Sequence, residues 1–203
     1  MRLFLLTAVT MTAFAANSVL ARLALADGAI DPASYTLVRI ACGAAMLALI
    51  ARAFKVQRPD AQSPLKAGNL VSALALFAYA AGFSFAYLAL DTGTGALILF
   101  ACVQATMIGW SISRGERQLL LEWAGLIAAF AAFVWLVSPG LTAPDPLGAA
   151  LMAAAGVAWG IYSLRGRTSP DPLAATGGNF LLAVPAAAAL CVIAFASLSA
   201  SPF

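Results

Sequence analysis

The sequence predicts an all-α polytopic membrane protein with about seven transmembrane helices. Of its 203 residues 63% are hydrophobic and 9% are charged, against about 25% charged in ordinary globular domains. Between Lys66 and Arg114 the only charged residue is Asp91. Each uncharged arm, 67–90 and 92–113, exceeds the roughly 20 helical residues that cross a bilayer core. The two arms therefore predict a membrane hairpin that turns at Asp91, because so short a chain lacks the polar surface to cover them in water.

Charges and prolines delimit the other segments. The first predicted span covers 3–21; a cleaved signal peptide with an Ala-x-Ala site at 13–15 is the alternative, but the apolar pattern continues past that site. The second span, 33–51, follows Pro32, a residue suited to the first turn of a helix. After the hairpin, three more spans are expected at 123–138, 146–164 and 174–195.

The cations predict the orientation of the chain in the membrane. Cytoplasmic loops of membrane proteins carry an excess of lysine and arginine. With the N-terminus inside, all of the eleven cations except Arg22 and Arg39 fall on the inner side, and the outer loops carry aspartates. The net charge of +3 is thus a topology signal and does not indicate a nucleic-acid partner. We expect a multi-pass protein of the plasma (inner) membrane with a cytoplasmic N-terminus and the lipid bilayer as its surroundings.

Two parts of the chain are weakly similar to each other. Residues 31–39 align without a gap with 171–179 and share Asp, Pro and Thr. A repeat unit of five helices is odd in number, so two copies must insert in opposite directions. Inverted repeats are typical of secondary transporters, whose solute site lies near the midplane between the copies. We therefore expect a first repeat at 2–138 and an incomplete second one, of two helices, at 145–203.

Short motifs follow one another in a defined order along residues 31–140. They are Asp31-Pro32 with Arg39, Gly82-Phe83-x-Phe85-Ala86-Tyr87-x-Ala89-Leu90, Gly115-Glu116-Arg117, Trp123-x-Gly125 and Ser138-Pro139-Gly140. In this order they resemble the EamA domain of the drug/metabolite transporter superfamily. The resemblance implies ten helices in two repeats and transport of small organic solutes such as amino acids or metabolites. The chain departs from it in two ways: the proline common in the fourth helix is missing near Gln104, and the second repeat stops after two helices.

Polar and aromatic side chains within the spans are the candidate solute-binding residues, since a polar group in hydrocarbon has to face protein or a cavity. They are Asn17, Arg39, Tyr79, Phe83, Tyr87, Gln104, Trp159 and Asn179. Tyr79, Phe83 and Tyr87 share one helix face and would also serve as packing. Gln104 is the preferred candidate because its amide both donates and accepts hydrogen bonds; an interhelical hydrogen bond is its alternative. Three roles are considered for the Arg39 side chain: facing a pocket where it attracts a carboxylate, snorkelling to the outer headgroups, or pairing with another group for structural reasons.

Several chemistries are not expected. The chain has no histidine, and its three cysteines stand singly, so no metal or other cofactor is predicted. No Gly-x-Ser-x-Gly elbow or buried carboxylate indicates an enzyme. Asp91 lies at an outer turn and Glu122 at an inner helix start, so proton exchange through a membrane carboxylate is not expected.

The leading hypothesis is a permease for a small-molecule solute that works by alternating access. The alternative is a truncated, non-transporting membrane fragment of such a permease; a seven-helix receptor explains the internal similarity less well. Gly156 and Gly160 form a small-residue motif that predicts close packing of their helix on a neighbour. The solute, the direction of flux, the coupling ion and homo-oligomerisation remain open.

Overall fold

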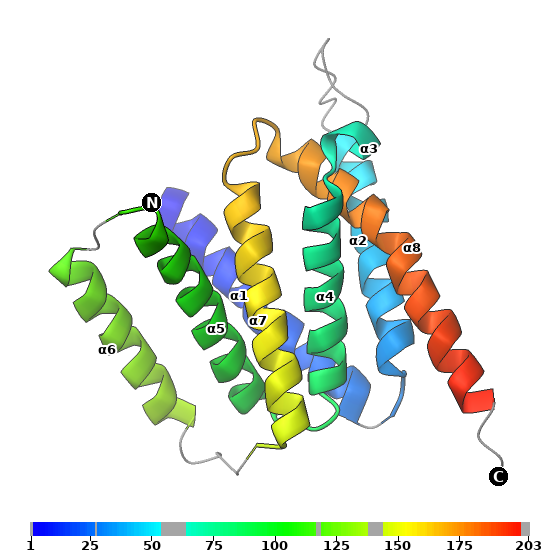
Figure 1. Ribbon diagram of the computed structural model, residues 1–203, viewed down its shortest axis with the longest axis horizontal. Helices are drawn as coiled ribbons and strands as arrows, with labels where there is room; N and C mark the ends of the chain where they lie inside the picture. Colours follow the sequence, from blue (N-terminus) through cyan, green and yellow to red (C-terminus); the bar gives the residue numbers. More distant parts are fainter. Residues whose placement is uncertain (1, 27, 54–63, 117–118, 138–143, 200–203) are drawn as a thin grey trace.

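The computed structural model describes residues 2–26, 28–53, 64–116, 119–137 and 144–199, and helices make up nearly all of them. The helices are α1 (Arg2–Ala26), α2 (Pro32–Ala53), α3 (Pro64–Ala67), α4 (Leu70–Ala86), α5 (Thr92–Ser113), α6 (Leu120–Val137), α7 (Pro146–Gly166) and α8 (Pro172–Ser199). The described residues contain no strand. Apart from the single turn α3, successive helices run in opposite directions (Figure 1). The prediction of an all-α chain is therefore confirmed.

Three of the helices begin at an Asp-Pro pair. The side chains of Asp31, Asp145 and Asp171 each accept a hydrogen bond from a backbone N–H two or three residues further on, at 2.7 to 3.2 Å. These bonds satisfy N–H groups that have no partner within the helix. The proline that follows each aspartate has no N–H to satisfy and is preset for the first turn. Pro32 begins α2, as predicted.

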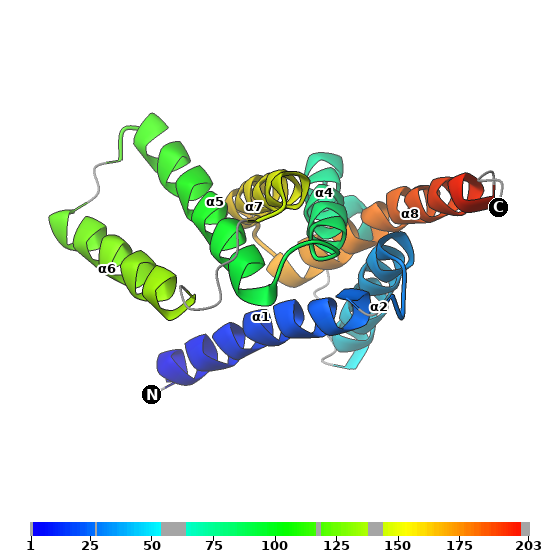
Figure 2. The same cartoon turned by 90° about the horizontal axis from the view of Figure 1, so that it is seen from below.

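Helix α4 is the centre of the bundle. It packs against α7, α8 and α2, while α5 packs on the other side of α7 and α6 contacts α5. Figure 2 shows α1 lying across one face of this layer. A Cβ on Gly156 would lie 2.7 Å from the Leu99 carbonyl oxygen, and one on Gly160 would lie 2.8 Å from the Thr106 Cβ. Both glycines thus allow α7 to approach α5 closely, which confirms the packing predicted for them.

Within the described residues, five helices are long and apolar enough to cross a membrane. These stretches are Leu3–Leu25, Pro32–Ala53, Thr92–Ser113, Pro146–Gly166 and Pro172–Phe195. Helix α4, with 17 residues, and an apolar stretch of α6, Trp123–Ala132, are shorter. Large apolar side chains face outward, with Leu120 86%, Leu3 79% and Trp135 79% exposed. Such a surface would be unfavourable in water and suits lipid, so the helices indicate a membrane protein.

Charged residues gather at opposite ends of the bundle. In Figure 1 the start of α2, the α4–α5 turn and the start of α7 lie together at the lower end. This acidic end carries Asp31, Asp91 and Asp145. The C-terminal ends of α2, α5 and α7 and the short α3 lie at the upper end. This basic end carries Arg52, Lys66, Arg114, Arg165 and Arg167.

Candidate functional site

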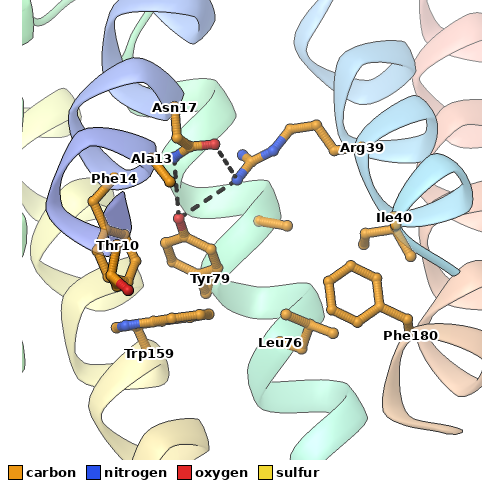
Figure 3. Close-up of a pocket in the computed structure, with 12 residues that line it drawn as sticks. Thr10, Ala13, Phe14, Asn17, Arg39, Ile40, Leu76, Tyr79, Trp159 and Phe180 are labelled. Carbon is orange, nitrogen blue, oxygen red and sulfur yellow. Dashed lines mark hydrogen bonds between the residues drawn. The ribbon is translucent and has the colours of Figure 1, made fainter. Parts of the chain in front are cut away.

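A pocket of about 420 Å³ lies between α1, α2, α4, α7 and α8. Figure 3 shows its polar corner, where side chains from α1, α2 and α4 meet, and the aromatic and aliphatic groups that surround it. The lining residues are Thr10, Ala13, Phe14, Asn17, Arg39, Ile40, Gly43, Leu76, Tyr79, Ala80, Trp159 and Phe180. The pocket therefore draws on both ends of the chain, with α1, α2 and α4 on one side and α7 and α8 on the other.

Asn17, Arg39 and Tyr79 form a hydrogen-bonded triad in this pocket. Arg39 Nη2 donates to Asn17 Oδ1 at 3.3 Å and to the Tyr79 hydroxyl oxygen at 3.4 Å. Asn17 Nδ2 also donates to the Tyr79 hydroxyl, at 3.4 Å. Hydrogen bonds from a guanidinium are usually shorter, near 2.9 Å. The three bonds of the triad are therefore long for their type.

Arg39 is held among aromatic rings. Its guanidinium carbon lies 4.7 Å from the centre of the Phe83 ring, 5.4 Å from that of Tyr35 and 5.6 Å from that of Tyr79. Its Nη1 is buried and has no hydrogen-bond partner within the described residues. The side chain therefore turns inward toward α1 and α4, which contradicts the snorkelling alternative. The ring faces stabilise the cation through their quadrupoles, but no carboxylate in the described residues forms a salt bridge with it.

Aromatic rings also line the pocket beside the triad. The ring centres of Trp159 and Tyr79 are 4.6 Å apart. Phe14 meets Trp159 edge-on, with ring centres 6.1 Å apart. On the α2 side, the Phe180 ring occupies the space that a Cβ on residue 43 would need, so Gly43 allows α8 to bring this ring to the pocket. The pocket thus combines one cationic, hydrogen-bonding corner with a large apolar surface.

The structure brings four of the predicted residues together: Asn17, Arg39, Tyr79 and Trp159 all line the pocket. Phe83 lies behind Arg39, fully buried, and contacts Tyr79 with ring centres 5.5 Å apart. Its ring lies against the guanidinium and does not line the pocket.

Three predicted residues lie elsewhere. Tyr87 is buried one turn nearer the acidic end, where its hydroxyl donates to the Thr92 carbonyl oxygen at 3.4 Å. Gln104 has an exposed side chain on α5, a helix that contributes nothing to the pocket lining. Asn179 is buried at the basic end, and its Oδ1 accepts a hydrogen bond from the Asn69 N–H at 2.8 Å. The preferred candidate of the sequence, Gln104, is therefore not part of this pocket.

The remaining lining residues were missed because they are apolar or small. Helical spacing would have found part of the set, since Thr10 and Phe14 precede Asn17 by seven and three positions and Leu76 precedes Tyr79 by three. Phe180 offers no such signal, because no polar residue of α8 lines the pocket.

In the described part of the chain, the fold and the pocket thus define a helical protein with apolar helices of membrane-spanning length and a half-open, solute-sized pocket. No protein-family model matches the chain, and no solved structure matches it. A Pseudomonas aeruginosa protein described as "Uncharacterized protein PA1977" is 48% identical over 197 residues. The match covers 96% of this chain, and the chain spans 66% of the relative's length. That description states no activity, so the function has to be argued from the site.

Proposed function

We propose that this chain forms a permease for small organic solutes and that the pocket of Asn17, Arg39 and Tyr79 is its solute site. The observation that carries the proposal is the position of the pocket. It is lined by α1, α2 and α4 of the first predicted repeat and by α7 and α8 of the second. In transporters built from inverted repeats the solute binds at this kind of boundary, and the repeats rock against each other around it.

On the motifs described above, we also propose that the chain belongs to the EamA-type transporters. The proposed activity needs neither an enzyme reaction nor a cofactor. It also includes seven crossings of the inner membrane with a cytoplasmic N-terminus. Support comes from the alternating helix directions and from the gathering of cations at one end. Helix α4 has only 17 residues but is surrounded by α2, α7 and α8, so it needs less contact with lipid than an outer helix.

Cysteine labelling tests the topology. In a background in which the three native cysteines are replaced by alanine, Lys66→Cys and Arg167→Cys at the basic end should react with a membrane-impermeant maleimide only from the cytoplasmic side. Ala29→Cys and Ala89→Cys at the acidic end should react only from the outside; all four parent side chains are exposed. Labelling of Lys66→Cys and Arg167→Cys from opposite sides would overturn the topology and the repeat.

Uptake into liposomes tests the transport activity. The purified chain is reconstituted and assayed with a radiolabelled panel of amino acids, organic acids and amides. We expect uptake of at least one solute, lost in Tyr79→Leu and kept in Trp135→Phe, a substitution on the exposed surface of α6. No uptake of any solute by the chain, with its helix content intact in the liposomes, would contradict the proposal for this chain.

The second candidate function is a non-transporting membrane fragment of a permease. The chain spans 66% of the relative's length, so the relative is assayed beside it. The same uptake assay on the Pseudomonas aeruginosa relative separates the two candidates. Uptake by the relative and none by the chain would support the fragment, whereas uptake by both would exclude it.

A further inference from the structure

We propose that the pocket selects organic monoanions, in which a carboxylate binds at Arg39 and an apolar or aromatic body lies against Trp159 and Phe14. This inference rests on the proposed function, because it names the substrate class of the same site. It also narrows that function: amino acids, which carry an ammonium group beside the carboxylate, are expected to bind poorly.

The first argument is the charge of the pocket. Arg39 is the only charged residue among the described residues that line it. A guanidinium stays protonated in proteins, and none of the described carboxylates pairs with this one. A partly buried cation without a counter-ion is unfavourable, and its attraction to an anion is stronger than in bulk water. An anionic solute would supply the missing counter-ion.

The second argument is the hydrogen-bond inventory. A guanidinium has five N–H donors, whereas Arg39 makes side-chain hydrogen bonds only through Nη2, at 3.3 and 3.4 Å, and its buried Nη1 has no partner among the described residues. The Tyr79 hydroxyl accepts from Arg39 and Asn17, which leaves its own proton to be donated. A carboxylate offers several lone pairs to such donors. The pocket is therefore rich in donors and short of acceptors.

The third argument concerns the rest of the solute. Trp159, Phe14 and Phe180 present aromatic surface around a space of about 420 Å³, which favours an apolar or aromatic body. None of the lining residues is acidic. An ammonium group placed next to the carboxylate would lose its water and approach the Arg39 cation without a partner. A plain carboxylate thus fits better than a zwitterion with the same body.

Calorimetric titration of the detergent-solubilised 203-residue chain near pH 7 tests the proposal with three probes that share one body. They are 3-phenylpropanoate, its amide and phenylalanine. We expect the carboxylate to bind at least about tenfold more tightly than either of the others, since a hydrogen bond to a charged group is stronger than one to a neutral group. Arg39→Gln should reduce carboxylate binding to the level of the amide.

Two variants keep the test interpretable. Arg52→Gln removes an exposed cation from the end of the same helix and should leave all three affinities unchanged. Arg39→Lys keeps the charge but loses the planar fork, so it should show intermediate carboxylate affinity if Arg39→Gln fails to fold.

The outcomes separate this inference from the permease proposal. Equal affinity for acid and amide, or tighter binding of phenylalanine, would overturn the monoanion inference and leave transport of another solute intact. Selective, Arg39-dependent carboxylate binding without uptake into liposomes would uphold the inference and contradict the permease. No binding of any probe by a folded chain would overturn the inference.

Discussion

The guanidinium carbon of Arg39 lies 4.7 Å from the centre of the Phe83 ring, and Phe83 is fully buried. A half-buried cation such as Arg39 is stabilised by about 1 kcal/mol over an aromatic face. No carboxylate pairs with Arg39 in the described part of the chain, so this ring adds to the negative partial charge that the Asn17 and Tyr79 oxygens supply. The contact fixes the cation of α2 against α4 while the opposite edge of the guanidinium remains at the pocket.

Phe83→Leu should lower the free energy of unfolding by about 2 kcal/mol, because it removes both core packing and the ring beneath the cation. In an Arg39→Gln background the same substitution should cost about 1 kcal/mol less, since no cation remains to be stabilised. Unfolding in detergent, followed by circular dichroism for the wild type, both single variants and the double variant, measures this coupling. Additive effects would show that the ring is packing only.

The positions of the helices could be predicted from the sequence because charges and Asp-Pro pairs mark their ends. Pro32 begins α2, and Asp91 directly precedes α5, as the spacing of charges predicted. The single turn α3 was not predicted, because Pro64–Ala67 is too short to carry a periodic pattern and lies in a polar linker. The length of α4 was overestimated: the uncharged arm covers 67–90, but the helix ends at Ala86 and a turn follows.

The site could be predicted only in part. Asn17 and Gln104 look equivalent in the sequence, since each is a lone amide in an apolar helix, yet only Asn17 faces the pocket. A helix in lipid is apolar on all sides, so the usual amphipathic pattern does not show which face is inside. Leu99, Val103 and Thr106 turn toward α7 or the core, which directs Gln104 away from them. That rotation follows from packing between helices far apart in the chain.

Adding a single methyl group at the close contact between α5 and α7 should markedly lower the stability of the fold. A Cβ on Gly156 would lie 2.7 Å from the Leu99 carbonyl oxygen, a backbone atom that cannot move aside alone. Gly156→Ala should therefore lower the free energy of unfolding by about 1–3 kcal/mol. Gly109→Ala is the matched control, because nothing lies within 4 Å of its Cβ position; it should be neutral or stabilising by up to about 1 kcal/mol. Equal effects of the two substitutions on thermal unfolding would refute the contact.

Arg22 stabilises the C-terminal end of α4 through backbone carbonyls more than through its ion pair. Its Nη1 donates to the Tyr87 carbonyl oxygen at 2.7 Å and to that of Leu88 at 3.3 Å, whereas its Nη2 lies 3.9 Å from Asp91 Oδ1, on a carboxylate that is 60% exposed. Arg22→Gln should lower the melting temperature clearly, while Asp91→Asn should change stability by less than about 1 kcal/mol. The Arg22 effect should persist at high salt. A larger loss in Asp91→Asn would show that the ion pair dominates.

The cap of α2 predicts a pH dependence. Hydrogen bonds from Ser34, through its hydroxyl and its backbone N–H, hold the pKa of the Asp31 carboxyl below its ordinary value. A group whose pKa is lower in the folded state stabilises the fold above its unfolded pKa of about 4 and loses that contribution as the pH falls through the folded value. Asp31→Asn keeps a capping oxygen without the charge. The melting temperature of the wild type should exceed that of Asp31→Asn near pH 7, and the difference should shrink below about pH 4; a difference that stays constant would contradict the assignment.

Asn179 is expected to contribute to the stability of the fold but not to solute binding. Its Oδ1 accepts the Asn69 N–H at 2.8 Å, at the start of α4, and it does not line the pocket. Asn179→Ala leaves this partly buried N–H without its acceptor, so the free energy of unfolding should fall by about 1 kcal/mol. The affinity of the folded variant for 3-phenylpropanoate should stay within about twofold of the wild type. Asn17→Ala should behave in the opposite way, since its amide is half-buried and belongs to the triad. If Asn179→Ala instead abolished carboxylate binding at unchanged stability, the solute site would have to extend to the basic end of α8.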